Sequence, residues 1–404
     1  MQLVEKQIIK RTDRRYKELL ELCHLSKNLY NVVLYTIRQH WFETVNDDTV
    51  KHKFLNYYDV WNILKKDNPD YKAIDSHAAQ LVIKQVEANF SSFFSLLKLK
   101  KQGKYDKKVH LPTYLDKDGY NVISFNQFRR RELKNSYVSL PKSKTLKFKV
   151  KNTSLHFINI VPKNDYIQVN FIYKKQEKEL KKDNGKYMSI DIGVDNLATC
   201  FSNVGKTFIV DGKKVKHINQ FYNKKIGEVK SELKKKNDKE KSHKTRQLTL
   251  KRNNKIDDYL HKTSRYIISQ AASNDVRTII VGHNKNWKQE VSIGKVNTQN
   301  FVSIPFDKLI YELKYKGILE GINVIEIEES YTSKCSALDN ETVEKHDKYI
   351  GKRIHRGLFQ SKDYLLNADV NGAINIMRKF LKCNCDAVMP TDVGFVYNPV
   401  KVHL

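Results

Sequence analysis

The sequence contains few of the residues that cross-link a chain or anchor it to a membrane. Its 404 residues include only five cysteines, an odd number at uneven spacings. This predicts free thiols in a reducing compartment rather than a disulfide framework. No apolar run approaches the roughly 20 residues that span a bilayer, and the first residues lack an apolar secretory segment. We therefore expect a soluble cytoplasmic protein with no membrane partner.

Acidic residues are scarce relative to basic ones. The chain has 74 Lys+Arg against 45 Asp+Glu, a formal net charge of +29, which favours a polyanionic partner. Its 22 tyrosines and 18 phenylalanines provide faces on which unpaired bases could stack, although most aromatic side chains belong to cores. These features indicate a nucleic-acid-binding protein.

The densest positive charge lies at 213–262, where 17 Lys+Arg stand against 6 Asp+Glu. A charge run is usually a solvated face, but periodic apolar residues here predict a helical hairpin with cationic sides. Clustered cations near phosphates are favoured by counterion release. We expect four lysines of this stretch to contact nucleic acid: Lys234, Lys235, Lys236 and Lys239.

Hydrophobic periodicity predicts an α+β protein of several domains. Helical spacing covers 13–42, 57–66 and 76–99, within a helical insertion at 11–108. Strand-like alternation follows at 111–114, 122–125, 137–140, 146–150, 157–161 and 166–173. We predict that residues 1–10 and 109–183 form a β-barrel domain interrupted by the helical insertion. Residues 184–404 form a separate α/β domain.

A single acid stands inside an apolar, β-branched strand of that second domain. Asp191 lies in the run 187–191, directly before Ile192 and Gly193, and a second strand at 196–202 completes a hairpin. A buried carboxylate costs several kcal/mol unless a cation or hydrogen bonds hold it. A simple turn role fits Asp195 better, because that residue sits at the bend. We interpret Asp191 as a metal ligand.

Two later stretches carry further acids in a related pattern. The stretch 367–377 is a predicted helix start, with Asn367 as N-cap and Asp369 in the first turn. A strand at 278–282, a helix, and a strand running into 322–333 form a β-α-β unit. Together these elements describe a ribonuclease-H-like core, in which acids from separate elements gather around two divalent metals.

With these residues in place, the chain resembles the TnpB/OrfB family of insertion-sequence-encoded RNA-guided nucleases, relatives of type V CRISPR effectors. The resemblance runs nearly end to end and includes motifs at 29–31, 190–193, 315–316, 331–336 and 367–375. It implies a RuvC-like nuclease domain at 184–404 with sheet order 3-2-1-4-5. The implied partners are a non-coding guide RNA and target double-stranded DNA, cut beside a short motif.

The sequence departs from this family at the second catalytic acid. Relatives usually carry it at the end of the fourth strand, where this chain has no acid at 281–284. One interpretation is a dead nuclease that still binds DNA. The other is relocation to Glu329 on strand five, as in a subgroup with a Glu-x-x-Thr-Ser signature. Two strand steps are roughly 10 Å, and Gly282 leaves room. Adjacent residues point to opposite faces, so Glu328 cannot serve together with Glu329.

The second departure concerns zinc. Relatives usually carry two Cys-x-x-Cys pairs before the final helix, whereas this chain has only Cys335 there. The pair Cys383 and Cys385 is too closely spaced and lies outside that segment. We expect no zinc. The zinc-less insertion 334–366 contains a segment, 339–359, that is predicted to be a basic loop near substrate and to present Arg353 and Arg356 to nucleic acid.

The preferred hypothesis is hydrolysis of DNA phosphodiesters with two Mg²⁺ (or Mn²⁺) ions. The catalytic residues and metal ligands would be Asp191, Glu329 and Asp369, whose oxygen donors suit such ions. Two alternatives stay open at this point. One is a catalytically inactive RNA-guided DNA-binding protein, and the other is a transposase or accessory transposition protein. The protein would be cytoplasmic and associated with the nucleoid when bound to DNA.

Overall fold

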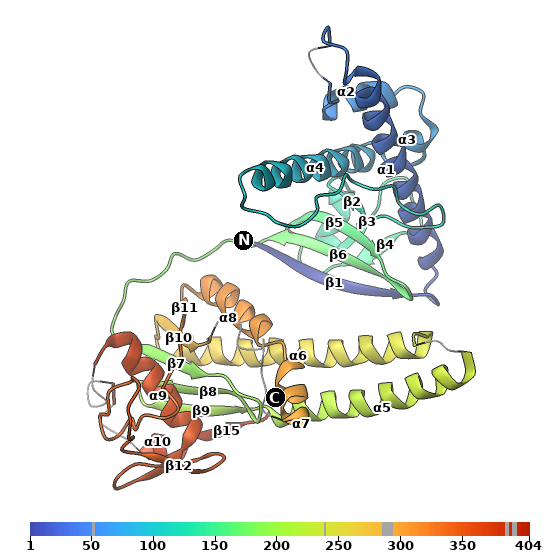
Figure 1. Ribbon diagram of the computed structural model, residues 1–404. Coiled ribbons are helices and arrows are strands. Elements are labelled where there is room, and N and C mark those ends of the chain that lie inside the picture. The colour runs from blue at the N-terminus through green and yellow to red at the C-terminus, as the bar shows by residue number, and fades with distance from the viewer. Residues whose placement is uncertain (51–52, 238–239, 285–293, 384–387, 390–393) are drawn as a thin grey trace. The chain divides into compact units, whose positions relative to one another are not determined.

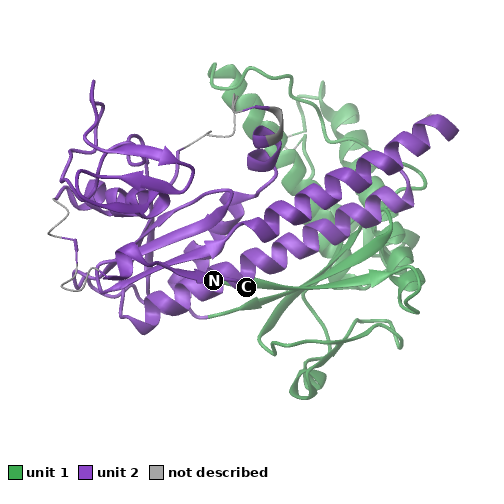
Figure 2. Ribbon diagram, turned by 90° about the horizontal axis from the view of Figure 1, so that it is seen from below, with its two compact units in different colours: residues 1–175 green, residues 176–404 purple. Residues whose placement is uncertain are grey.

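The chain folds into two compact units, Met1–Lys175 and Gln176–Leu404 (Figures 1 and 2). The computed structural model describes residues 1–404 except 51–52, 238–239, 285–293, 384–387 and 390–393. No helix in these described ranges has the length and apolarity required to cross a bilayer.

Four α-helices of the first unit pack on one another and share a core with its sheet. They are α1 (Tyr16–Thr44), α2 (Tyr57–Leu64), α3 (Pro69–Ala73) and α4 (Ser76–Lys101), close to the helical spacing in the sequence. Polar caps set their starts: Asn56 and Asp59 form a capping box on α2, and Asp75 caps α4. The buried stripes of α1 and α4 belong to one hydrophobic cluster with the strands.

The strands of the first unit do not close into a barrel in the described residues. An antiparallel sheet has the order β1 (Gln2–Lys10), β6 (Tyr166–Lys174), β5 (Leu155–Pro162), β2 (Ile123–Phe125). The strands β3 (Tyr137–Ser139) and β4 (Lys147–Lys149) form a separate pair, preceded by a short 3-10 helix at Arg130–Asn135. The predicted strand at 111–114 is wrong, since this stretch lies outside any strand. Local alternation does not determine which strands pair, so the barrel expectation is replaced by an open sheet.

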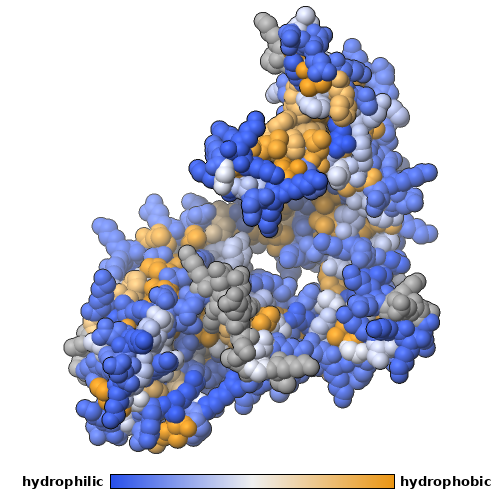
Figure 3. Space-filling view, viewed as in Figure 1, coloured by the Kyte–Doolittle hydropathy of each residue, from blue (hydrophilic) through white to orange (hydrophobic). Residues whose placement is uncertain are grey.

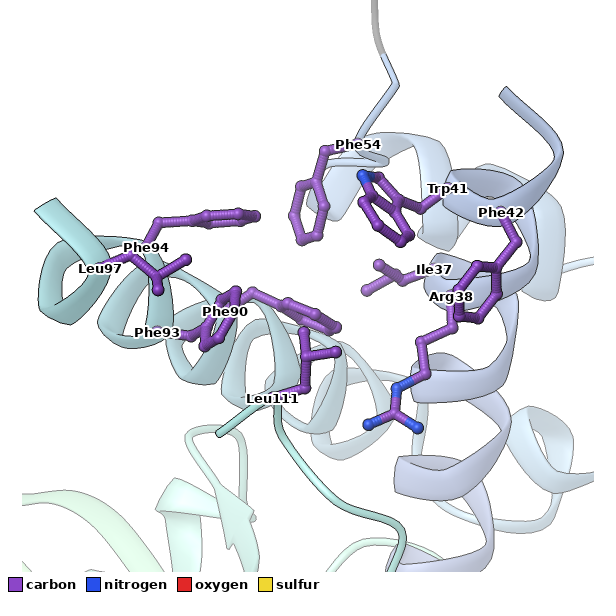
Figure 4. Close-up of a pocket in the computed structure, with 10 residues that line it drawn as sticks. All are labelled: Ile37, Arg38, Trp41, Phe42, Phe54, Phe90, Phe93, Phe94, Leu97 and Leu111. Atoms are coloured by element: carbon purple, nitrogen blue, oxygen red, sulfur yellow. The ribbon is translucent and has the colours of Figure 1, made fainter. Parts of the chain in front are cut away.

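An apolar pocket opens between α1 and α4 of this unit (Figure 4). Its volume is about 210 Å³, and its lining is aromatic and aliphatic apart from Arg38. Trp41, Phe42 and Phe94 remain 38%, 58% and 45% exposed. Hydrophobic residues accordingly gather on this face of the unit (Figure 3).

A six-stranded mixed sheet forms the centre of the second unit. Its strand order is β11 (Asn323–Ile327), β10 (Thr278–Gly282), β7 (Tyr187–Asp191), β8 (Asn196–Ser202), β9 (Lys206–Asp211), β15 (Val400–Val402). β7 pairs antiparallel with β8 and parallel with β10, which pairs parallel with β11. The first five strands therefore have the predicted order, and β15 adds a sixth that the sequence pattern did not indicate.

Helices cover both faces of this sheet (Figure 1). On one face, α6 (His243–Ser273) and α8 (Phe306–Glu320) share a core with Ile279 and Val281 of β10. On the other face, α9 (Ala368–Leu381) packs with Ile280. Alternate residues of a strand point to opposite faces, so one buried strand serves both layers. The remaining helices are α5 (Lys213–Asn237), α7 (Lys295–Val302) and α10 (Gly394–Tyr397).

The segment before α9 contains a small antiparallel sheet with the order β12 (Lys352–His355), β13 (Leu358–Gln360), β14 (Leu365–Asn367). Sequence reasoning predicted a basic loop here and missed these strands. Side chains on one side of α9 hold the turns that precede this sheet. We call this side, made up of Asn371, Asn375 and Arg378, the α9 amide face. Asn371 and Asn375 both donate to the carbonyl of Cys335, at 2.9 and 2.7 Å, and Arg378 donates to that of Glu341. Cys335 itself is fully buried.

Candidate active site

Asp191 is the last residue of β7 and faces α9. The strand alternates, with Met188 and Ile190 in the core beneath α6 and α8, and Ser189 on the opposite side. Ser189 Oγ donates to the carbonyl of Ala373 in α9 at 2.6 Å. Asp191 lies two residues further along the same face and is partly buried. The strand period thus directs its carboxylate toward the start of α9.

A glycine allows the close approach between this carboxylate and the helix. A Cβ built on Gly372 would lie 2.6 Å from Asp191 Oδ2, closer than real Cβ contacts permit. The predicted N-cap is confirmed, because Asn367 Oδ1 accepts the backbone N–H groups of Asp369 and Val370 at 2.9 and 3.3 Å. This cap fixes Asp369 in the first turn, one helical turn before Gly372.

Glu329 lies two residues beyond the end of β11 and reaches across the end of β10. A Cβ built on Gly282 would lie 3.2 Å from Glu329 Oε2, so the missing side chain at Gly282 leaves room for this carboxylate. Asn284 holds the residue at both ends: its Oδ1 accepts from the Glu329 backbone N–H at 3.1 Å, and its Nδ2 donates to Glu329 Oε1 at 3.4 Å. The neighbouring Glu328 is exposed.

The negative charges of two carboxylates, Glu329 and Asp369, act on the third, Asp191. Burial raises the pKa of Asp191 well above its usual value, and the negative charges of Asp369 and Glu329 raise it further. Arg353 partly offsets this shift in the Asp191 pKa. Burial also raises the pKa of Glu329, while the charges of His283 and Lys379 oppose that effect. A bound cation would relieve the repulsion acting on Asp191 and would favour its ionised form.

Glu329 and Asp369 both accept hydrogen bonds from side chains of the protein. Asp369 accepts from Asn196 Nδ2 at 2.7 Å and pairs with the Arg353 guanidinium at 3.2 Å. The part of the chain that the structure describes contains no group of three or more His, Cys, Asp or Glu side chains already arranged around one ion position. The donor set is nevertheless all oxygen and anionic, which fits Mg²⁺ or Mn²⁺. In the described structure the carboxylates of Glu329 and Asp369 are close enough to affect the pKa of Asp191, but the three carboxylates are not arranged around one ion position.

A wide polar cleft adjoins Asp369. Its volume is about 1350 Å³, and five cations contribute to its lining: Lys213, Lys216, Arg353, Arg356 and Lys401. Asp195, assigned to a simple turn in the sequence, pairs with Lys216 at 2.8 Å and with Arg356 at 2.9 Å. Burial opposes ionisation of Asp195, but these two cations together lower its pKa. The cleft therefore combines two acids with a majority of positive charge.

The residues expected to bind nucleic acid separate into two groups. Arg353 and Arg356 lie at the cleft, each paired with an acid. Lys234, Lys235 and Lys236 are exposed in the last turn of α5. From Lys216 to Lys234 the helix rises about 27 Å, so these lysines lie well away from the cleft end of α5. Lys239 lies outside the described residues.

Sequence reasoning missed several residues of the site. Gly372, Asn284, Asn196, Lys213 and Lys216 each contact an acid or line the cleft, yet each is unremarkable within its own sequence window. All five lay inside stretches that the sequence had indicated, but none had been assigned a role. Their roles follow only from contacts between distant segments.

Parts of the chain match known protein families. Residues 170–288 match the OrfB_IS605 family, described as a probable transposase, and residues 306–376 match the Cas12f1-like TNB domain. The TnpB-like protein ORF457 of Acidianus two-tailed virus is 26% identical over 95% of this chain and 85% of that protein. A CRISPR-associated endodeoxyribonuclease Cas12f2 from a Micrarchaeota archaeon is 30% identical over 54% of this chain and 40% of that protein.

Among solved structures, that of the mini-RNA-guided endonuclease CRISPR-Cas_phi3 aligns with a TM-score of 0.47 at 11% identity. This alignment covers 96% of this chain and 92% of that one. The matched families extend over both the β7–β10 region and the segment that carries Glu329 and Asp369. These matches support the TnpB/OrfB family as the family of this chain.

Proposed function

We propose that this protein is an RNA-guided DNA endonuclease of a transposable element. The observation that carries the proposal is the coupling of Asp191, Glu329 and Asp369, which come from three separate elements, beside a cation-lined cleft. Carboxylates gathered from different elements of a ribonuclease-H-like sheet are suited to two-metal phosphodiester hydrolysis. Similarity to a CRISPR-associated endodeoxyribonuclease supports the substrate class.

The three acids would hold two Mg²⁺ or Mn²⁺ ions, which supply an activated water and stabilise the leaving oxygen when bound. The protein's own residues prepare this site. Asn284 orients the Glu329 carboxylate, and Asn196 orients that of Asp369. Arg353 would exchange Asp369 for a substrate phosphate, so that binding of nucleic acid releases an acid for the metal. Lys213 and Lys216 would hold the adjacent phosphates as charges.

A guide RNA would supply sequence choice by base pairing, while the protein recognises the backbone of the heteroduplex, as in a different RNA-guided effector. The partners would then be a non-coding RNA and target double-stranded DNA. The net charge of +29 is suited to both.

One observation favours a second candidate, a guided binder that does not cut. Arg353 is paired with Asp369, and the described acids are not arranged around one ion position. If this arrangement persists on DNA, the nuclease domain would act only as a scaffold.

The test is cleavage of a matched plasmid by protein expressed with its native flanking DNA, after sequencing of the copurified RNA. Wild-type protein should cut in Mg²⁺ and stop in EDTA. Asp191→Ala should bind the target with unchanged affinity, but its cutting rate should fall by more than about 100-fold. Such a loss is larger than that typical for residues that contact a metal only through its ligands. Guided binding without any cutting by the wild type would leave the binder, and absence of bound RNA would refute both candidates.

A further inference from the structure

A second, smaller groove lies between α5 and α6, which run side by side (Figure 1). Its volume is about 220 Å³, and each helix contributes one face. The contribution from α5 is His217, Ile218, Phe221 and Tyr222, and that from α6 is Leu248, Lys251, Arg252 and Lys255. Their spacings are those of one helical face in each case. The groove therefore combines aromatic rings with three cations.

The floor of this groove is held rigidly. The Tyr222 hydroxyl and the Thr249 hydroxyl lie 3.0 Å apart in a hydrogen bond, which links the two helices. Arg252 donates to Asn219 Oδ1 at 2.8 Å and to the carbonyl of Ser303 at 2.6 Å. Its guanidinium also lies over the Tyr222 ring, 5.8 Å from the centroid. Tyr222 and Arg252 are thus fixed before any ligand arrives.

The rim, in contrast, is open to solvent. Phe221 is 60% exposed, an unusual position for a phenylalanine on a helix rich in lysine. Lys251 and Lys255 are also exposed, one helical turn apart on α6. An accessible aromatic face flanked by exposed cations can stack a base and neutralise the phosphates on either side of it.

The groove continues from the proposed catalytic cleft. His217 lines both cavities, and Phe221 follows it by one turn of α5, a rise of about 6 Å. Lys213 and Lys216 extend the positive charge from the cleft along the same helix. A polynucleotide strand that leaves the cleft would meet Phe221 next.

We propose that this groove is a stacking subsite for one unpaired nucleobase of a single-stranded polynucleotide. The base would stack on Phe221, and Lys251 and Lys255 would contact its phosphates. A base inside a duplex has both faces covered by neighbouring base pairs, so an open phenylalanine selects an unpaired strand. This inference rests on the proposed function only in naming the strand that passes the cleft. It adds a nucleic-acid contact in this groove to the one expected at the end of α5.

The test measures binding in EDTA, without cleavage, of full-length protein freed of RNA. The probes are a dodecamer of deoxythymidylate and an abasic dodecamer with the same number of phosphates. Phe221→Ala should weaken binding of the deoxythymidylate by about fivefold to a hundredfold and leave the abasic probe within about twofold. Phe221→Tyr should bind both probes like the wild type, while Phe221→Leu should resemble Phe221→Ala because it keeps apolar volume without a stacking face.

Two controls separate stacking from charge and from general disturbance. The double variant Lys251→Gln/Lys255→Gln should weaken both probes by the same factor and reduce the salt slope by about 1.4. Tyr311→Ala, which removes an aromatic side chain that is 66% exposed on α8, should change neither probe. If Phe221→Ala binds the deoxythymidylate like the wild type, or weakens both probes equally, the subsite is refuted. Insensitivity of both probes to Phe221 and to the two lysines would exclude the groove as a binding site for a single strand.

The two proposals fail separately. Protein that shows base-dependent loss at Phe221 but never cuts a matched plasmid would refute the endonuclease alone. Protein that cuts its target yet binds both probes independently of Phe221 would refute the subsite alone.

Discussion

Gly372 and Asp191 are packed so closely that a single added methyl group would collide with the carboxylate. The Cβ built at position 372 lies 2.6 Å from Asp191 Oδ2. We expect Gly372→Ala to displace either the carboxylate or α9, and to reduce cleavage by about 100-fold, because small misplacements at a reacting centre are costly. Overpacking should also lower the free energy of unfolding by about 1–3 kcal/mol. The higher helix propensity of alanine offsets part of this loss.

The matched control is Gly227→Ala in the middle of α5, where an added Cβ meets nothing within 4 Å. That substitution should leave cleavage unchanged and stabilise the protein by up to about 1 kcal/mol. Thermal unfolding and a plasmid assay measure both quantities. Full activity of Gly372→Ala would show that the approach of α9 does not determine the site.

Substituting Glu328 and Glu329 separately tests which of these two carboxylates is required for cleavage. Glu329 reaches across Gly282 and is held by Asn284, whereas Glu328 is exposed. Glu329→Gln keeps the shape of the side chain. If Glu329 is a metal ligand as proposed, this change should reduce the cutting rate by more than about 100-fold. Glu328→Gln should stay within about threefold, as expected for an exposed residue. A reversed result would keep the mechanism and move the assignment by one residue.

A side chain at the end of β10 would displace the side chain of Ile376 in α9. A Cβ at Gly282 would collide with Cδ1 of Ile376. Gly282→Ala should therefore destabilise the protein by about 1–3 kcal/mol. Ile376→Val removes the colliding atom and alone should cost about 0.5–1.5 kcal/mol. The double variant should lose less free energy of unfolding than the sum of the losses in the two single variants. Denaturant titration of all three variants measures this difference. Simple additivity would disprove the contact.

The ion pair between Arg353 and Asp369 should compete with metal binding in the free protein. Arg353→Gln removes the competitor, and we expect Mn²⁺ affinity to rise by up to about fivefold, the range for a partly exposed pair. Arg356→Gln is the control, because that guanidinium pairs with Asp195 instead. Calorimetric titration without nucleic acid measures both. Equal affinities in the two variants would show that Arg353 does not limit metal binding.

The lysines at the end of α5 stay a prediction for nucleic-acid binding. Lys234, Lys235 and Lys236 are exposed there, so the triple change to Gln should cost little stability. If all three contact duplex phosphates, the slope of log affinity against log salt should fall by about 2.7. Lys262→Gln, whose lysine is paired with Asp258, should change the slope by less than one. An unchanged slope in the triple variant would make this end of α5 a solvated surface.

Local patterns predicted the helices and the central sheet because burial periodicity is written into each segment. Helical spacing identified α1, α2 and α4, and the family resemblance supplied the order of β7 to β11. The barrel failed for a physical reason: alternation tells which residues face the core but not which strands pair. The short strand β15 pairs with β9 across nearly 200 positions, and its own sequence contains no record of that partner.

The same limit applies to the site. Asp191 and Asp369 stood out because an acid in a buried strand and an acid in a first helical turn are recognisable locally. Their surroundings were not recognisable in this way. Asp195 looked like a turn residue, yet it pairs with Lys216 and Arg356 from two other elements. Such pairings depend on tertiary distance, which a single sequence does not contain.

The α9 amide face has a consequence for how the last part of the protein responds to its chemical surroundings. Asn371, Asn375 and Arg378 hold the turns before β12 by hydrogen bonds, and none of these groups titrates near neutral pH or reacts with mild oxidants. The hydrogen bonds that α9 makes to this segment themselves contain no thiol and no metal ion. If the proposed carboxylate site binds Mg²⁺, we therefore expect the loss of cleavage in EDTA to be reversed when Mg²⁺ is added back.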